Sequence, residues 1–106
     1  MALFRRGRSA RPGRLRPASR EDLDHLEAFA RGRRGVEGFI EPRTTVTETT
    51  LILIAFDGEW TRRRIGSPED AWRFGQRVGV PIYDVALVGY PNRMREYNAR
   101  QKAAEA

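Results

Sequence analysis

The sequence predicts an α+β fold: one small domain with a four-stranded mixed sheet and the element order α-β-β-β-α-β-α, preceded by a disordered basic arm. Three observations support this prediction. The chain has 106 residues, which suffices for a single small domain. Its apolar residues change between helical and strand spacing along residues 19–106. Its excess of basic residues lies at the amino-terminal end, in residues 1–18.

The expected arm, residues 1–18, holds Gly and Pro among its arginines and few large apolar residues. Such a segment cannot bury enough apolar surface to offset the entropy lost on ordering, so we expect disorder. Residues 1–20 hold seven arginines and no acid, whereas residues 21–106 hold 13 basic and 14 acidic residues. The net charge of +6 therefore comes from the first twenty residues. The Arg-rich composition is typical of a GC-rich bacterium, but that bias does not explain the missing acids.

The first helix is expected at about residues 20–31, because Ser19 and Asp22 form a capping-box pattern. Gly32 is the expected helix stop. An apolar stripe at helical spacing supports the helix and consists of Leu23, Leu26, Phe29 and Ala30.

Three strands are expected next, at about residues 35–41, 44–56 and 59–65. Asp57-Gly58 suits a two-residue type I′ turn between the second and third of them. The second strand is apolar on both faces and should be central, while the third is mostly polar and should be an edge. In the register of a two-residue turn, the facing pairs are Ala55 with Trp60, Leu53 with Arg62 and Leu51 with Arg64.

The second half of the chain repeats these signals. Residues 67–70, Ser-Pro-Glu-Asp, start a second helix that Gly79 ends. Its apolar stripe is Ala71, Phe74, Gly75 and Val78. A buried-type strand is expected at residues 82–88 and a last helix at about residues 92–103. Trp72 lies one position off the stripe; a broad buried face of this helix that includes Trp72 is favoured over a partly exposed contact residue.

No catalytic site, cofactor site or metal site is predicted. The chain lacks cysteine, and its serines lie in the arm or at expected helix caps. His25 is the one histidine, and a solvated position on the first helix is favoured over a catalytic role. Asp84 interrupts an apolar strand; pairing with an arginine or a place near a strand end is favoured over a functional acid. The enzyme hypothesis is therefore set aside.

Two patterns in the sequence favour a structural interpretation over a binding one. Residues 32–35, Gly-Arg-Arg-Gly, have the spacing of the phosphate clamp of KH domains, but that clamp joins two helices and here a strand follows. A helix stop and turn is predicted instead. The first five elements follow the order of double-stranded-RNA-binding domains; because residues 67–70 are acidic, only the topology is compared.

The third strand places Trp60, Arg62 and Arg64 on one face and Arg63 on the other. An arginine-aromatic strand can bind nucleic acid by stacking and phosphate contact. The same charges also suit an exposed edge strand that resists strand addition. The sequence leaves both interpretations open.

The leading hypothesis is a non-catalytic accessory protein that binds RNA or a ribonucleoprotein through its arm. Five to seven arginine–phosphate contacts predict a slope of log K against log salt of roughly −3 to −6. The alternative is a protein-interaction module whose arm docks on an acidic protein or an anionic membrane surface. The candidate nucleic-acid-binding residues are Arg5, Arg6, Arg8, Arg11, Arg14, Arg16, Arg33, Arg34, Trp60, Arg62 and Arg64.

The sequence also bears on location. No apolar run approaches the ~18 residues needed to span a bilayer, and no secretory apolar stretch is present, so we expect a cytoplasmic protein. An organellar targeting arm that is cleaved off is a third possibility, although Gly and Pro disfavour the amphipathic helix of such a segment.

Overall fold

The computed structural model describes residues 18–46 and 48–105, so the arm lies outside the described residues except for Ala18. The predicted α+β fold with a four-stranded mixed sheet is confirmed. The elements are α1 (Arg20–Gly32), β1 (Glu37–Glu41), β2 (Thr50–Ile54), β3 (Trp60–Arg64), α2 (Pro68–Val78), β4 (Ile82–Asp84), α3 (Val85–Val88) and α4 (Asn92–Glu105).

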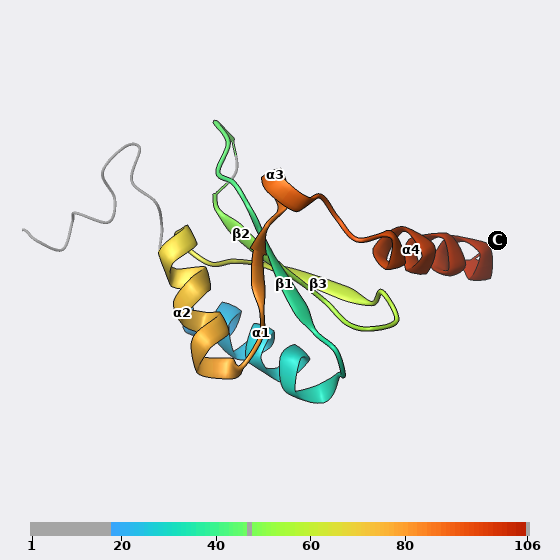
Figure 1. The fold of residues 1–106 in the computed structure, drawn as a ribbon, viewed down its shortest axis with the longest axis horizontal. Coiled ribbons are helices and arrows are strands. Elements are labelled where there is room, and N and C mark those ends of the chain that lie inside the picture. The colour runs from blue at the N-terminus through green and yellow to red at the C-terminus, as the bar shows by residue number, and fades with distance from the viewer. Residues whose placement is uncertain (1–17, 47, 106) are drawn as a thin grey trace, which may run out of the picture.

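The strands lie in the order β3-β2-β1-β4. β1 and β2 are antiparallel, as are β2 and β3, while β4 runs parallel to β1. The prediction of a central second strand and an edge third strand is confirmed. Figure 1 shows α1 and α2 on one side of the sheet and α4 extending away from the strands toward the carboxyl terminus.

The helices α1 and α2 start where their predicted caps lie. The Ser19 hydroxyl accepts a hydrogen bond from the Asp22 amide and the Asp22 carboxylate accepts one from the Ser19 amide, which completes the capping box. The Ser67 hydroxyl caps α2 by accepting a hydrogen bond from the Asp70 amide, and Gly79 ends α2 in the left-handed conformation at φ 82°.

The main core lies between the sheet and the two helices α1 and α2, on what we call the helix-covered face. The strands β1, β2 and β4 contribute buried side chains to it, and Ile65 follows directly after β3. Its buried members are Leu26, Phe29, Val36, Ile40, Leu51, Leu53, Ala55, Ile65, Ala71, Phe74, Val80 and Ile82.

The opposite side of the sheet, which we call the second face, has a smaller core. Phe39, Ile52, Ile54 and Met94 are buried there, and Trp60 and Val85 pack against them. Met94 is the one buried residue among the described residues of α4. This helix therefore contacts the sheet with its first turns and is exposed beyond them.

The predicted two-residue hairpin turn was wrong. Ala55 and Glu59 form the last pair, because the Ala55 amide donates to the Glu59 carbonyl and the Gly58 amide to the Ala55 carbonyl. The turn thus spans Phe56 to Gly58, with Gly58 at φ 93°, the common three-residue form with a left-handed last residue. One extra turn residue shifts the register by one, so Trp60 opposes Ile54 and Arg62 opposes Ile52.

The predicted strand over residues 82–88 was too long. β4 ends at Asp84, whose side chain accepts from the Ala86 amide and caps the short helix α3. The partner strand explains the break, since Asp84 opposes Ile40 and only one residue of β1 remains before Pro42. β2 is shorter than predicted for the same reason: Thr50 opposes Glu41, and the residues before Thr50 have no β1 partner.

Candidate nucleic-acid interface

Six of the predicted binding residues lie outside the described residues: Arg5, Arg6, Arg8, Arg11, Arg14 and Arg16. Without them the chain has 14 basic and 14 acidic residues, so the described domain is formally neutral. Each remaining candidate can be judged by what its guanidinium or ring already contacts.

Arg62 is bound within the domain. Its Nε and Nη2 donate to the two carboxylate oxygens of Glu41 at 2.7 and 2.9 Å, the bidentate geometry of a strong charge-assisted pair. The same guanidinium lies 5.2 Å from the centre of the Trp60 ring. The ring nitrogen of Trp60 donates to Asn98 of α4 at 2.8 Å. On the second face, Trp60 therefore binds α4 and Arg62 binds Glu41 of β1. The two side chains do not form an open surface on which a base could stack.

The Glu41 carboxylate is the centre of this cluster, which we call the Glu41 cluster. Besides Arg62, it accepts hydrogen bonds from the Thr50 hydroxyl at 2.7 Å and from the Tyr90 hydroxyl. Burial raises the pKa of Glu41, but the hydrogen bonds from Arg62, Tyr90 and Thr50 outweigh it, so the net pKa lies below its usual value. The anion ties three strands to the loop before α4.

Arg33 and Arg34 are adjacent in sequence but differ in their contacts. Arg33 donates two hydrogen bonds to Glu59, at 3.1 and 2.8 Å, and lies 4.1 Å over the Phe29 ring. Arg34 has no carboxylate partner among the described residues and lies 5.0 Å over the ring of Phe56. As predicted, the segment is a helix stop and turn, and it leaves one of its two guanidiniums unpaired.

Arg64 lies at the other end of β3, opposite Thr50. Within the described part of the chain no carboxylate pairs with it. Four of the predicted arginines lie in the domain. Two of them, Arg34 and Arg64, could bind an anion without first losing a carboxylate partner, whereas Arg33 and Arg62 could not.

His25 does not occupy the solvated position that was favoured. It is half-buried against β3, with Nε2 on the Thr61 hydroxyl and Nδ1 3.2 Å from Arg63. Burial and the nearby Arg63 and Arg33 lower the pKa of His25. Helical spacing places His25 on the first helix, but only the packing of α1 against β3 decides that the ring is half-buried. Asp84 lies at a strand end, as favoured, and caps α3.

Arg93 was not predicted to matter, yet it fastens α4 to the sheet. It donates from Nε to the Ala55 carbonyl at 2.9 Å and from Nη2 to Glu37 at 2.7 Å and to the Ile54 carbonyl at 3.3 Å. No local pattern signals these contacts, because Arg93 lies 38 residues beyond Ala55 in the sequence.

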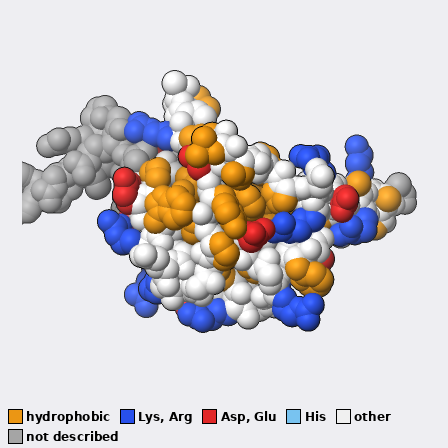
Figure 2. All heavy atoms as spheres, viewed as in Figure 1, with side chains coloured by type: hydrophobic (Ala, Val, Ile, Leu, Met, Phe, Trp, Pro, Cys, Tyr) orange, Lys and Arg blue, Asp and Glu red, His pale blue; other side chains and the backbone are white. Residues whose placement is uncertain are grey.

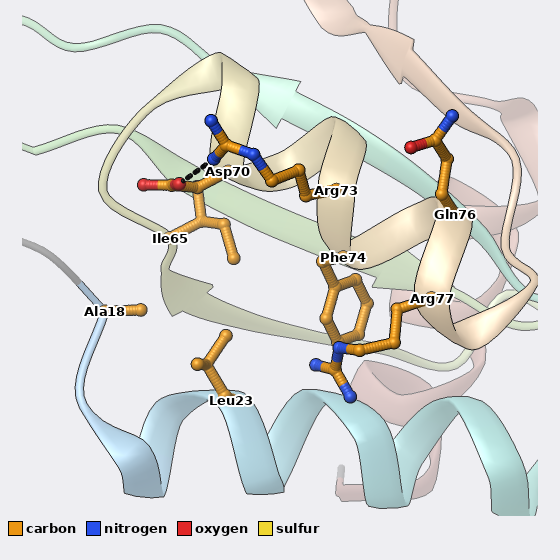
Figure 3. A pocket seen from close by; sticks show the side chains of 8 residues that line it. All are labelled: Ala18, Leu23, Ile65, Asp70, Arg73, Phe74, Gln76 and Arg77. Atoms are coloured by element: carbon orange, nitrogen blue, oxygen red, sulfur yellow. Dashed lines mark hydrogen bonds and ion pairs between the residues drawn. The ribbon is translucent and has the colours of Figure 1, made fainter.

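An open groove of about 680 Å³ lies between α1 and α2, where the chain leaves the undescribed arm at Ala18 (Figure 3). Leu23, Ile65 and Phe74 are its apolar lining. Arginines lie on its rim, and both are engaged: Arg73 pairs with Asp70 at 2.6 Å and Arg77 with Glu27 at 2.8 Å.

An apolar surface lies over β4 and α3. Leu87 is 84% exposed and Val88 58%, and a small hollow of about 210 Å³ lies between Phe39, Tyr83 and Val88. Figure 2 shows apolar side chains gathered in this region of the molecule, with basic side chains toward the margins. Trp72 on α2 is 47% exposed, so the favoured interpretation of a broad buried face that includes it was wrong.

Residues 18–46 and 48–105 contain no cluster of three or more His, Cys, Asp or Glu side chains that could hold a metal ion. None of the helices in those residues is both long and apolar enough to cross a bilayer. No protein-family model, no curated protein and no solved structure matches the chain.

Proposed function

We propose that the protein is a non-catalytic RNA-binding accessory protein whose arginine arm attaches it to RNA or to a ribonucleoprotein. The observation behind this proposal is the separation of charge. The six arginines before residue 17 hold the whole net charge of +6, while the rest of the chain balances 14 basic against 14 acidic residues. Arginine binds phosphate with two parallel hydrogen bonds, and release of counterions from the polyanion provides the affinity.

The contacts inside the domain support the same assignment. Arg31, Arg33, Arg62, Arg73, Arg77 and Arg93 each form an ion pair with a carboxylate of the domain. Cations that are already paired add little to the attraction of a polyanion. The arm is therefore the proposed source of affinity, and the unpaired Arg34 and Arg64 are the proposed contributors from the domain.

The proposal is tested by substitutions that remove the charge of the arm and leave its length unchanged. In the full chain, the six arm arginines at positions 5, 6, 8, 11, 14 and 16 are replaced together by glutamine, and in a matched control by lysine. Fluorescence anisotropy at several salt concentrations then reports binding to single-stranded RNA, duplex RNA and duplex DNA. The full chain and the lysine variant are expected to bind with a slope of log K against log salt of about −4 to −5.

The glutamine variant is expected to lose most of this affinity and most of the slope, because its arm releases no counterions. If the unaltered full chain binds no RNA near physiological salt, the RNA-binding proposal is wrong. If the lysine and glutamine variants bind equally well, the arm is not the attachment site.

A protein-binding module is the second candidate, favoured by the exposed Leu87 and Val88. Soluble domains seldom expose contiguous apolar side chains without a partner. Leu87→Asp in the full chain is expected to abolish capture of a protein partner and to leave RNA binding unchanged. Loss of RNA binding in this variant would instead place the apolar surface within the RNA interface.

A further inference from the structure

The turn between β2 and β3 presents an aromatic ring where turns ordinarily present polar groups. Phe56 is the first residue of this turn and is 58% exposed. In Figure 2 the region of this turn, at the lower right, shows apolar atoms bordered by basic side chains. An exposed ring at a loop tip is unexplained by packing and so calls for another interpretation.

The loop after α1 holds Arg34 against this ring. The Phe56 amide donates to the Arg34 carbonyl at 3.0 Å, which extends the sheet hydrogen bonding by one pair. Gly35 has φ +61°, and a Cβ there would lie 3.0 Å from the Phe56 Cβ, so glycine allows the close approach. The Arg34 guanidinium lies 5.0 Å from the ring centre, within cation–π range.

The α4 helix supports the turn from another side. Arg100 donates to the Asp57 carbonyl at 2.7 Å. A Cβ at Gly58 would lie 2.0 Å from the Arg93 carbonyl oxygen and 2.8 Å from the Tyr97 Cβ, so α4 packs directly on the turn. Arg100 also lies 5.9 Å over the Tyr97 ring. Contacts from two elements therefore fix the turn, and a ligand of the ring would bind without ordering the backbone.

We propose that Phe56 and Arg34 form a stacking site for an unpaired base of single-stranded RNA, which rests on the proposed RNA-binding function. An exposed ring accepts a base on its face, and every base offers such a face. The Arg34 guanidinium has no carboxylate partner among the described residues, so it can contact the phosphate next to the stacked base. A duplex keeps its bases stacked inside, so the site selects single strands over duplexes.

The position of the site is compatible with a role beside the arm. The arm joins α1 at its amino-terminal end, and Arg34 follows its carboxyl-terminal end. A helix of 13 residues is about 20 Å long, so the start of α1, where the arm joins, and Arg34 lie about 20 Å apart. The arm supplies affinity for any polyanion, and the turn supplies the preference for a single strand.

Phe56→Ala in the full chain tests the ring. Binding of a fluorescent single-stranded RNA is expected to weaken by about 5- to 150-fold, the range for loss of one stacked base. Phe56→Tyr keeps an aromatic face and should bind within about twofold of the original. Trp72→Ala is the matched control, because it removes another exposed ring from α2 and should leave the affinity unchanged. Circular dichroism and thermal unfolding verify that each variant folds.

Arg34→Gln tests the cation, with Arg43→Gln as the matched control. Arg43 is exposed, also forms no ion pair among the described residues and lies beyond the opposite end of β1. Both substitutions remove one charge, so a nonspecific electrostatic effect would be equal in the two. Arg34→Gln should weaken single-strand binding more than Arg43→Gln.

Duplex RNA separates this inference from the function on which it rests. Phe56→Ala should leave duplex binding and its salt slope unchanged, because both depend on the arm. If the full chain binds RNA but Phe56→Ala binds single strands as well as before, the stacking site is wrong and the RNA-binding proposal stands. If Phe56→Ala weakens single-strand and duplex binding equally, the stacking site is also wrong.

Discussion

The two faces of the sheet are held in different ways. On the helix-covered face, α1 and α2 bury a continuous set of aliphatic and aromatic side chains. On the second face, four residues form the buried core, and the loop before α4 and α4 itself are held by the Glu41 cluster, by Arg93 and by the bond from Trp60 to Asn98. One face is stabilised mainly by apolar burial, the other largely by charge-assisted hydrogen bonds.

This difference changes how the arginines are interpreted. A row of Arg side chains next to Trp60 looks like a nucleic-acid interface when only the sequence is read. In the structure, Arg62 neutralises Glu41 inside the second face. Two of the arginines predicted to bind nucleic acid, Arg34 and Arg64, have no carboxylate partner among the described residues, and they lie at opposite ends of the sheet.

The largest effect is expected from opening a cavity on the helix-covered face. Leu53 is fully buried there, and Leu53→Ala should lower the free energy of unfolding by about 2–5 kcal/mol. Met94→Ala on the second face should fall at the low end of that range, because its small core can collapse around the gap. Urea unfolding of both variants measures the contrast. Equal losses would show that the two faces depend equally on burial.

The next largest effect on stability is expected from Arg93→Ala. It removes one donor each from the carbonyls of Ala55 and Ile54 and from the Glu37 carboxylate, and should cost about 1.5–3 kcal/mol. Hydrogen exchange should show faster exchange in the first turns of α4 while α1 and α2 keep their protection. Arg95→Ala is the control on the exposed side of α4. An equal loss of hydrogen-exchange protection in all helices would contradict the separate attachment of α4.

The Glu41 carboxylate makes the stability of the second face dependent on pH in a defined way. The folded pKa of Glu41 lies below its unfolded value of about 4.3, so the folded state favours the anion. Its stabilisation is present above pH ~4.3 and is lost as pH falls from there through the folded pKa. Glu41→Gln should lower stability near pH 7 by about 1–3 kcal/mol and remove this part of the acid dependence.

Thermal unfolding between pH 3 and pH 7 measures this effect, and Glu96→Gln on the exposed part of α4 is the control. A parallel stability profile for wild type and Glu41→Gln across the whole range would mean that the anion contributes nothing.

The smallest effect concerns a helix cap. The Ser67 hydroxyl accepts from the Asp70 amide at 3.2 Å, and Ser67→Ala should cost about 1 kcal/mol. This loss belongs to the helix-covered face, so hydrogen exchange in α4 should not change, in contrast to Arg93→Ala. Faster exchange in α4 would indicate that the two faces are coupled through the sheet.

Much of the fold could be predicted because its signals are local. Ser19 and Ser67 are caps whose partners lie three residues away, and the apolar stripes of α1 and α2 need only helical spacing. The apolar character of β2 on both faces was enough to place it inside the sheet. For these elements, local preference and tertiary packing agree.

The errors occurred where a distant residue decides between local alternatives. Asp57-Gly58 suits both a two-residue and a three-residue turn, and the longer one brings Trp60 opposite Ile54 on the second face, where α4 packs. Residues 85–88 are β-branched or apolar and favour a strand, but β1 ends too soon to pair with them. Phe56 was visible as an aromatic residue beside a turn, a signal that could have marked it as exposed.

The sequence by itself determined the fold class, the capped helices, the central and edge strands and the concentration of unbalanced basic charge in the first twenty residues. These features depend on residue spacing and on the sum of charges, which need no knowledge of distant contacts. Only the tertiary structure decided which arginines are paired, which face Trp60 joins and that Arg34 lies over Phe56. The partners in those contacts lie 21 residues apart for Glu41 and Arg62 and 38 for Trp60 and Asn98, so only folding brings them together.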